Sequence, residues 1–108
     1  MFCYPENISA ELRRVFDWLR RKKYLRGLSA IDFAKHAAWF LSEINAIHAF
    51  RDGNGRTQLS FLALLAAQAG HPLDLERLEP EGFLAAMIAS FKGRERPLVA
   101  ALGNLIER

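Results

Sequence analysis

The nine residues from His48 to Arg56 carry the kinds of side chain that phosphate chemistry requires. His48 can be neutral near pH 7, so its imidazole can accept a proton from an attacking hydroxyl. Asp52 supplies a hard oxygen ligand of the kind that Mg²⁺ takes alongside substrate phosphates. Arg56 supplies a guanidinium that can bind an anion. This density of groups predicts a site that binds the phosphates of a nucleotide and transfers part of that nucleotide.

Gly53, Asn54 and Gly55 form the backbone part of this predicted site. The glycines let the main chain approach a phosphate closely, and Asn54 tolerates unusual dihedrals while offering an amide donor. An apolar run from Leu59 to Ala67 follows, so we expect the loop to lead into a helix. The first amides of a helix have no internal partners and carry partial positive charge, which favours an anion.

Each of these residues also has an ordinary structural interpretation. His48 can cap a helix or lie in a core, Asp52 can cap a turn or a helix, and Arg56 can be solvated or paired with an acid. Phe50 is expected to be buried, where it pins the loop without taking part in the chemistry. The phosphate interpretation is favoured because the groups occur together in one short segment.

The elements that must position this loop are predicted to be helices. Apolar residues recur at helical spacing. Glycine, proline and capping residues such as Ser29 with Asp32 mark the ends of the predicted helices. The predicted helices cover about 5–24, 29–47, 55–70, 80–93 and 97–106. The predicted fold is therefore all-α, a single bundle of about five helices over residues 1–108. The third helix is expected to be the central one, because its apolar residues occupy every side.

Composition and charge limit the class of protein. The chain has 108 residues, of which half are hydrophobic and a quarter charged, as in one globular domain. The only cysteine, Cys3, cannot form an internal disulfide, and no apolar run approaches the length of about 20 residues that spans a membrane. We therefore expect a cytoplasmic protein without a membrane span or signal peptide, and translocation into a host cell stays open.

A basic segment in the first predicted helix has two interpretations. Cations complement the carbonyl end of a helix, so a solvated helix end is favoured, and a nucleic-acid-binding surface is the less expected alternative. Trp18 and Trp39 are expected in the core rather than as platforms for bases. His36 and His71 show no metal-ligand spacing. The basic residues are Arg13, Arg14, Arg20, Arg21, Lys22, Lys23 and Arg26.

The segment from His48 to Arg56 resembles the signature of the Fic family, usually written HxFx(D/E)GNGRxxR. Seven specified positions agree without a gap, and the flanking residues 44–47, Thr57 and Gln58 are similar as well. The resemblance covers nearly all of the chain. It implies a helical core and transfer of AMP from ATP to a Tyr, Thr or Ser hydroxyl of a target protein.

The resemblance also implies a role for each residue of the motif. His48 would deprotonate the target hydroxyl, and Asp52 would hold Mg²⁺. Residues 53–55 would cradle the phosphates of ATP, while Arg56 would contact the β-phosphate and stabilise the departing pyrophosphate. The reaction would be an in-line displacement at the α-phosphorus, in which the enzyme positions the reactants and neutralises developing charge.

Two positions and the N-terminal segment depart from the pattern of that family. Ala49 stands where proline is common, which is a minor change. Leu59 replaces the final arginine, whose guanidinium would meet the γ-phosphate, so we expect weaker ATP binding; alternatively, Leu59 joins Leu62 and Ala66 in the core. Met1–Tyr4 resemble only the return strand of the family's β-hairpin flap, so the flap and the preceding helix are expected to be truncated and target docking impaired.

The resemblance to the Fic family also bears on how the chain is regulated and on which other functions it could have. The inhibitory pattern (S/T)xxxE(G/N) of many relatives does not occur in the chain. A small antitoxin-like inhibitor acting in trans on a toxin-like enzyme stays open, although Leu59 would deny it the usual ion pair. The alternative functions are Fic-like transfer of another nucleotide or of phosphate, a weakly catalytic nucleotide- or protein-binding remnant, and a basic nucleic-acid-binding bundle.

Overall fold

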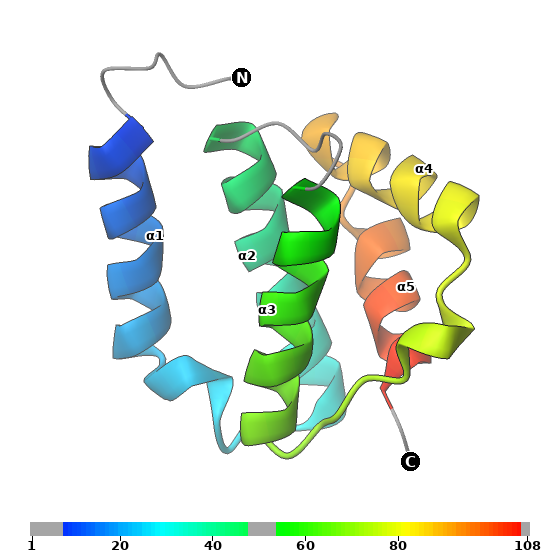
Figure 1. Cartoon of the computed structure of the whole chain (residues 1–108), viewed down its shortest axis with the longest axis horizontal. Coiled ribbons are helices and arrows are strands. Elements are labelled where there is room, and N and C mark those ends of the chain that lie inside the picture. Colours follow the sequence, from blue (N-terminus) through cyan, green and yellow to red (C-terminus); the bar gives the residue numbers. More distant parts are fainter. Residues whose placement is uncertain (1–7, 48–53, 107–108) are drawn as a thin grey trace.

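The computed structural model of the chain describes residues 8–47 and 54–106, and these residues form five α-helices and two 3₁₀ turns (Figure 1). The prediction of an all-α bundle of about five helices is confirmed. In the described part of the chain the only β pairing is a single bridge between Leu73 and Ile106. The elements are α1 (Ile8–Arg21), η2 (Lys23–Leu25), α2 (Ala30–Ile47), α3 (Asn54–Gln68), η3 (Leu75–Arg77), α4 (Pro80–Phe91) and α5 (Arg96–Leu105).

Local signals define most of the helix ends. The hydroxyl of Ser29 accepts a hydrogen bond of 3.1 Å from the backbone amide of Asp32, which caps the start of α2. The carboxylate of Glu79 accepts from the amide of Gly82 at the start of α4. After α3, Gly70 adopts a φ of 88°, a left-handed conformation that suits glycine at a helix end. The predicted starts and stops of these helices are confirmed.

The end of α1 differs from the prediction, because the α-helix stops at Arg21 instead of continuing to Tyr24. Lys23, Tyr24 and Leu25 have φ values of 55°, 55° and 63°, which a right-handed helix cannot contain. This conformation is unfavourable for residues with a Cβ atom. The complete burial of the Leu25 side chain, at the end of this turn, offsets the cost of that conformation.

The central helix of the bundle is α2, so the prediction that the third helix occupies the centre was wrong. Helix α2 contacts α1, α4 and α5, and it contributes the largest number of buried side chains among the described helices. Helix α3 buries Leu62, Leu65 and Ala66 but leaves Leu64 58% exposed. Apolar residues on every side of a helix do not by themselves determine which of those sides other helices cover. The buried residues of α2 are Phe33, Ala34, Ala37, Ala38, Phe40, Leu41, Ile44 and Asn45.

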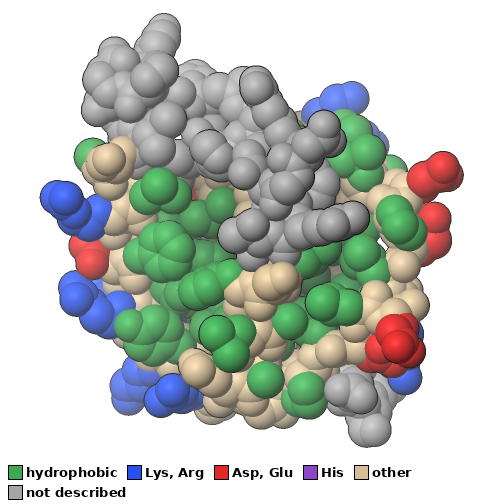
Figure 2. Space-filling model, in the orientation of Figure 1, with side chains coloured by type: hydrophobic (Ala, Val, Ile, Leu, Met, Phe, Trp, Pro, Cys, Tyr) green, Lys and Arg blue, Asp and Glu red, His purple; other side chains and the backbone are tan. Residues whose placement is uncertain are grey.

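Three phenylalanines join α3 to α1 and α2. The ring of Phe16 lies 5.8 Å from that of Phe40 and 5.7 Å from that of Phe61, in edge-to-face geometry. Phe40 is buried, whereas Phe16 and Phe61 remain partly exposed. Figure 2 shows hydrophobic side chains gathered on this face, over α1 and α3. Aromatic packing of this kind holds α3 against α1 and α2.

Candidate functional site

The motif predicted from the sequence lies between two helix ends. Helix α2 ends at Ile47, directly before His48, and the backbone of Asn54, Gly55 and Arg56 forms the first turn of α3. The predicted site residues His48, Asp52 and Gly53 lie outside the described residues. The expectation that the motif leads directly into a helix is confirmed, while the roles of its side chains remain predictions.

The first turn of α3 has the electrostatic character that an anion site needs. The leading amides of a helix point outward along its axis without intrahelical acceptors, and they carry partial positive charge. No acidic residue occurs in the first turn of α3 to neutralise that charge. The start of α3, a helix of 15 residues, therefore has the partial positive charge that favours an anion, and phosphate binding there remains a prediction.

Asn45 links the two helices on either side of the motif, and the sequence analysis did not single it out. Its side chain is completely buried. Its Nδ2 donates hydrogen bonds to the carbonyl oxygen of Leu41 at 2.9 Å and to Oε1 of Gln58 at 2.8 Å. The only signal in the sequence is one amide within the apolar run 44–47. The contact with Gln58 fixes the end of α2 to the second turn of α3.

Asn45→Ala is expected to lower the free energy of unfolding by about 1–3 kcal/mol, because the hydrogen bonds that Nδ2 donates to Leu41 and Gln58 are lost. Urea denaturation would measure the loss. Ser60→Ala is the matched control, since Ser60 is an exposed polar residue of α3. The double variant with Gln58→Ala should be less destabilised than the sum of the single variants. Additive losses would show that the link between the helices carries no energy.

A second polar contact joins α2 to α4. The hydroxyl of Ser42 donates to Oγ of Ser90 at 3.1 Å, and Ser90 Oγ donates to the carbonyl oxygen of Met87 at 2.7 Å. Ser90 is buried and Ser42 is half-buried, so this pair lies at the margin of the core. Together with Asn45 and Gln58, the two serines fix three helices to one another through hydrogen bonds. Such bonds specify a single arrangement better than apolar contacts alone.

The basic residues of α1 are partly used in surface ion pairs. Nη2 of Arg14 lies 2.8 Å from Oε1 of Glu43 in α2, and Arg20 lies 3.0 Å from Asp17. The hydrogen bonds that Arg14 donates to the carboxylates of Glu43 and then Glu11 raise the pKa of its guanidinium above its usual range. Because these groups are exposed, each pair contributes at most about 1 kcal/mol. The favoured prediction of a solvated basic helix end agrees with this exposure.

Leu59, the residue in place of the second arginine of the signature, is half-buried in α3. Its side chain packs against the core cluster that contains Leu62 and Ala66. The alternative that Leu59 joins the core is therefore correct in part, since its two neighbours are buried completely or nearly so and Leu59 is not.

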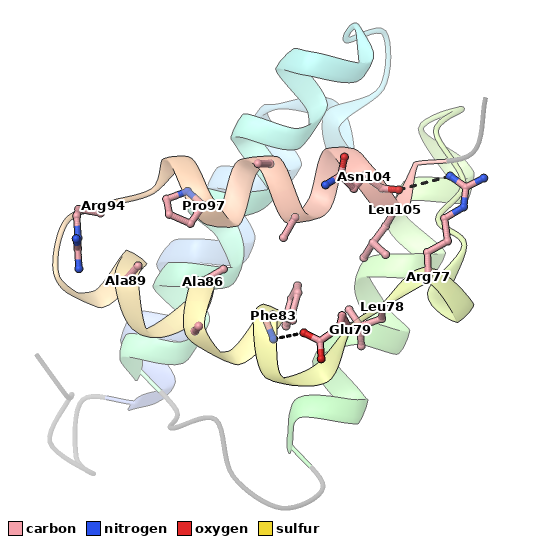
Figure 3. Close-up of a pocket in the computed structure, with 14 residues that line it drawn as sticks. Arg77, Leu78, Glu79, Phe83, Ala86, Ala89, Arg94, Pro97, Asn104 and Leu105 are labelled. Carbon is pink, nitrogen blue, oxygen red and sulfur yellow. Dashed lines mark hydrogen bonds between the residues drawn. The ribbon is translucent and has the colours of Figure 1, made fainter.

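A cavity of about 510 Å³ lies between α4 and α5 (Figure 3). Small apolar residues such as Ala86, Ala89 and Pro97 line it, and Arg77 and Arg94 lie at its two ends. Arg77 is engaged by the carbonyl oxygen of Asn104 at 3.5 Å. Among the described residues that line this cavity, none belongs to α3.

In residues 8–47 and 54–106 no three side chains of the His, Cys, Asp or Glu type come together in a way that could hold a metal ion. The predicted Mg²⁺ ligand, Asp52, lies outside these ranges. Within the same ranges no helix combines the length and hydropathy that crossing a membrane requires.

The chain is similar in sequence to proteins named as protein adenylyltransferases. It is 54% identical, over 97% of its length, to the probable protein adenylyltransferase y4lH of Sinorhizobium fredii, of which it covers 55%. It is 37% identical, over 94% of its length, to the protein adenylyltransferase VbhT of Bartonella schoenbuchensis, of which it covers 21%. The chain thus spans about half, or less, of the length of these relatives.

The fold is similar to that of solved Fic domains. The N-terminal Fic domain of a VirB-translocated Bep effector protein from Bartonella quintana, solved with bound ADP, superimposes with a TM-score of 0.91 at 30% identity. The match covers 98% of this chain and 50% of that one. The sequence model of the Fic/DOC family matches residues 1–66, which include the whole motif. With fold, motif and relatives in agreement, the chain belongs to the Fic/DOC family.

Proposed function

We propose that this chain transfers AMP from ATP to a Tyr, Thr or Ser hydroxyl of a target protein. The observation that carries the proposal is the start of α3 at Asn54, inside the segment that matches the Fic signature. A helix start with no acid in its first turn suits the phosphates of a nucleotide. The names of the adenylyltransferase relatives and the ADP in a related Fic domain support a nucleotide as the ligand.

In the proposed reaction His48 accepts the proton of the target hydroxyl while the oxygen attacks the α-phosphorus of ATP. The bond from that phosphorus to the bridging oxygen of the β-phosphate breaks, and pyrophosphate leaves. The amides of residues 53–55 hold the phosphates, and Arg56 neutralises charge on the β-phosphate. The carboxylate of Asp52 is a hard donor that suits Mg²⁺, which would supply further charge neutralisation when bound.

The partner and the compartment belong to the same proposal. The substrate is a protein, and the reaction takes place in a cytoplasm, either of the producing cell or of a host cell. The Bartonella quintana relative is described as a translocated effector, which supports the second case. A small inhibitor in trans stays a prediction, and it would have to bind without an ion pair at Leu59.

The proposal is tested by incubating the chain with Mg²⁺, labelled ATP and a cell lysate. Label from the α-phosphate is expected on a protein, and label from the γ-phosphate is not, because AMP keeps only the α-phosphate. Chelation of Mg²⁺ should abolish the transfer. Transfer of γ-label would show phosphate transfer, and label from another nucleotide alone would show a different nucleotide substrate. Binding of ATP without any label would show a binding remnant, and each of these three results would overturn the proposal.

Leu59→Arg is expected to tighten ATP binding by about 10-fold, because a hydrogen bond to a charged group contributes about 1.5–3 kcal/mol. Leu59 is only half-buried, so a longer side chain can keep its stem on the core while its guanidinium reaches solvent. Calorimetric titration with ATP measures the change. Leu59→Met is the control that preserves packing without adding charge. Equal affinity of the two variants would mean that position 59 does not face the γ-phosphate.

A further inference from the structure

Trp18 and Trp39 meet at the edge of the interface between α1 and α2. The prediction that they lie in the core is correct only in part, because both are half-buried and Trp18 packs against the core cluster. Their ring centroids are 4.3 Å apart with the planes tilted by 41°. The ring of His36 stacks on Trp18 with centroids 6.0 Å apart and planes at 22°. All three side chains are half-buried, so part of each ring remains accessible.

These three rings and two lysines line a shallow cavity of about 270 Å³, which we call the tryptophan pocket. It is lined by Trp18, Lys22, Lys35, His36 and Trp39. Its volume lies just below the range of about 300–1,000 Å³ that is typical of pockets for drug-sized ligands. The tryptophan pocket is therefore suited to one flat ring rather than to a large molecule.

The charge around the tryptophan pocket is positive. Lys22 and Lys35 are exposed, and within the described ranges neither forms an ion pair with a carboxylate. No acidic side chain belongs to the lining. The nearby carboxylate of Asp17 is already paired with Arg20 at 3.0 Å. Further exposed cations lie at the end of α1 and in the turn that follows it, namely Arg21, Lys23 and Arg26.

The polar atoms of His36 also suit a ligand. Its Nδ1 lies 2.8 Å from the carbonyl oxygen of Asp32, so that nitrogen carries the proton and donates it. With Nδ1 donating, Nε2 of the neutral ring is a hydrogen-bond acceptor, and it has no partner in the part of the chain that the structure describes. An amino or imino group on the edge of a flat ring would satisfy it.

Aromatic faces beside unpaired ammonium groups match one chemistry, a planar ring that carries a neighbouring phosphate. Bases stack on tryptophan in a way that tolerates any sequence, while lysines neutralise the phosphates of the backbone. A simple carboxylate would use the lysines and leave the rings unused. The further cations at the end of α1 and in the turn after it favour a strand with several phosphates over a single nucleotide.

We propose that the tryptophan pocket binds one nucleotide unit of a single-stranded nucleic acid, with its base on the rings of Trp18 and Trp39 and its flanking phosphates at Lys22 and Lys35. This proposal is independent of AMP transfer, because none of these residues lies in the motif. It departs from the expectation that nucleic acid is an unlikely partner, which stays untested until the experiment below.

The chain offers a direct optical test, because Trp18 and Trp39 are its only two tryptophans. Titration with a single-stranded oligothymidylate of about 10 nucleotides should quench the intrinsic tryptophan fluorescence. The double variant Lys22→Ala/Lys35→Ala should bind at least about 10-fold more weakly. Its dependence of log K on log salt should be shallower by about 1.4, since two phosphate contacts are lost.

Two further variants and two other ligands complete the test. Lys92→Ala removes an exposed lysine beyond α4 and should leave binding unchanged. Trp39→Leu should weaken binding at least about 5-fold, while Trp18 remains as the reporter. Thymidine monophosphate and polyglutamate should quench far less at equal concentration. The proposal is overturned if no quenching occurs, if either of those two competitors matches the oligonucleotide, or if the double lysine variant binds like the original chain.

Discussion

Replacing His48 by alanine is expected to slow the proposed AMP transfer by about 10²- to 10⁴-fold, which is the usual contribution of a general base. The reason is chemical rather than structural. A Tyr, Thr or Ser hydroxyl is a weak nucleophile until a neighbouring base removes its proton. The rate of transfer from α-labelled ATP to the target would measure the effect. Affinity for ATP should change little, because His48 acts on the hydroxyl and not on the phosphates.

Gln68→Ala is the control for this variant, because Gln68 is exposed at the far end of the helix that the motif begins. Its transfer rate should equal that of the unmodified chain. Thermal unfolding of both variants should match that of the unmodified chain, so that a loss of rate is not a loss of fold. If His48→Ala kept more than half of the transfer rate, His48 would not be the base.

Phe33→Ala is expected to lower the free energy of unfolding by about 3–5 kcal/mol, the range measured for removing a buried phenylalanine. Phe33 is 1% exposed in α2, and its ring lies 5.5 Å from that of His71. Removing it would leave a cavity where α2 meets the segment after α3. Domains of this size are stable by about 5–15 kcal/mol, so the loss would take a large part of the total.

Urea denaturation would measure this loss against Ile31→Ala, a matched change two residues earlier in the same helix. Ile31 is 68% exposed, so its truncation should cost less than about 1 kcal/mol. If Phe33→Ala is too unstable to purify, Phe33→Leu should show a smaller loss of the same sign. Equal losses for Phe33→Ala and Ile31→Ala would contradict the placement of Phe33 in the core.

The starts and stops of the helices could be predicted from the sequence because they depend on neighbours in the chain. Ser29 bonds to a backbone amide three residues away, and Gly70 adopts a left-handed conformation that its own lack of a side chain permits. The motif from His48 to Arg56 could be predicted for the same reason, because the residue types of one short segment determine its chemistry. Fold class, family and the proposed phosphate site all follow from such local information.

Only the tertiary structure decided which surfaces are covered and which distant residues meet. It made α2 rather than α3 the central helix, joined Asn45 to Gln58, and brought Trp18 and Trp39 together at the surface. Periodicity shows that a helix has an apolar side, but burial depends on the other helices that cover it. A hydrogen bond between residues 45 and 58 leaves no trace in local propensity, because its energy arises only when packing removes both groups from water.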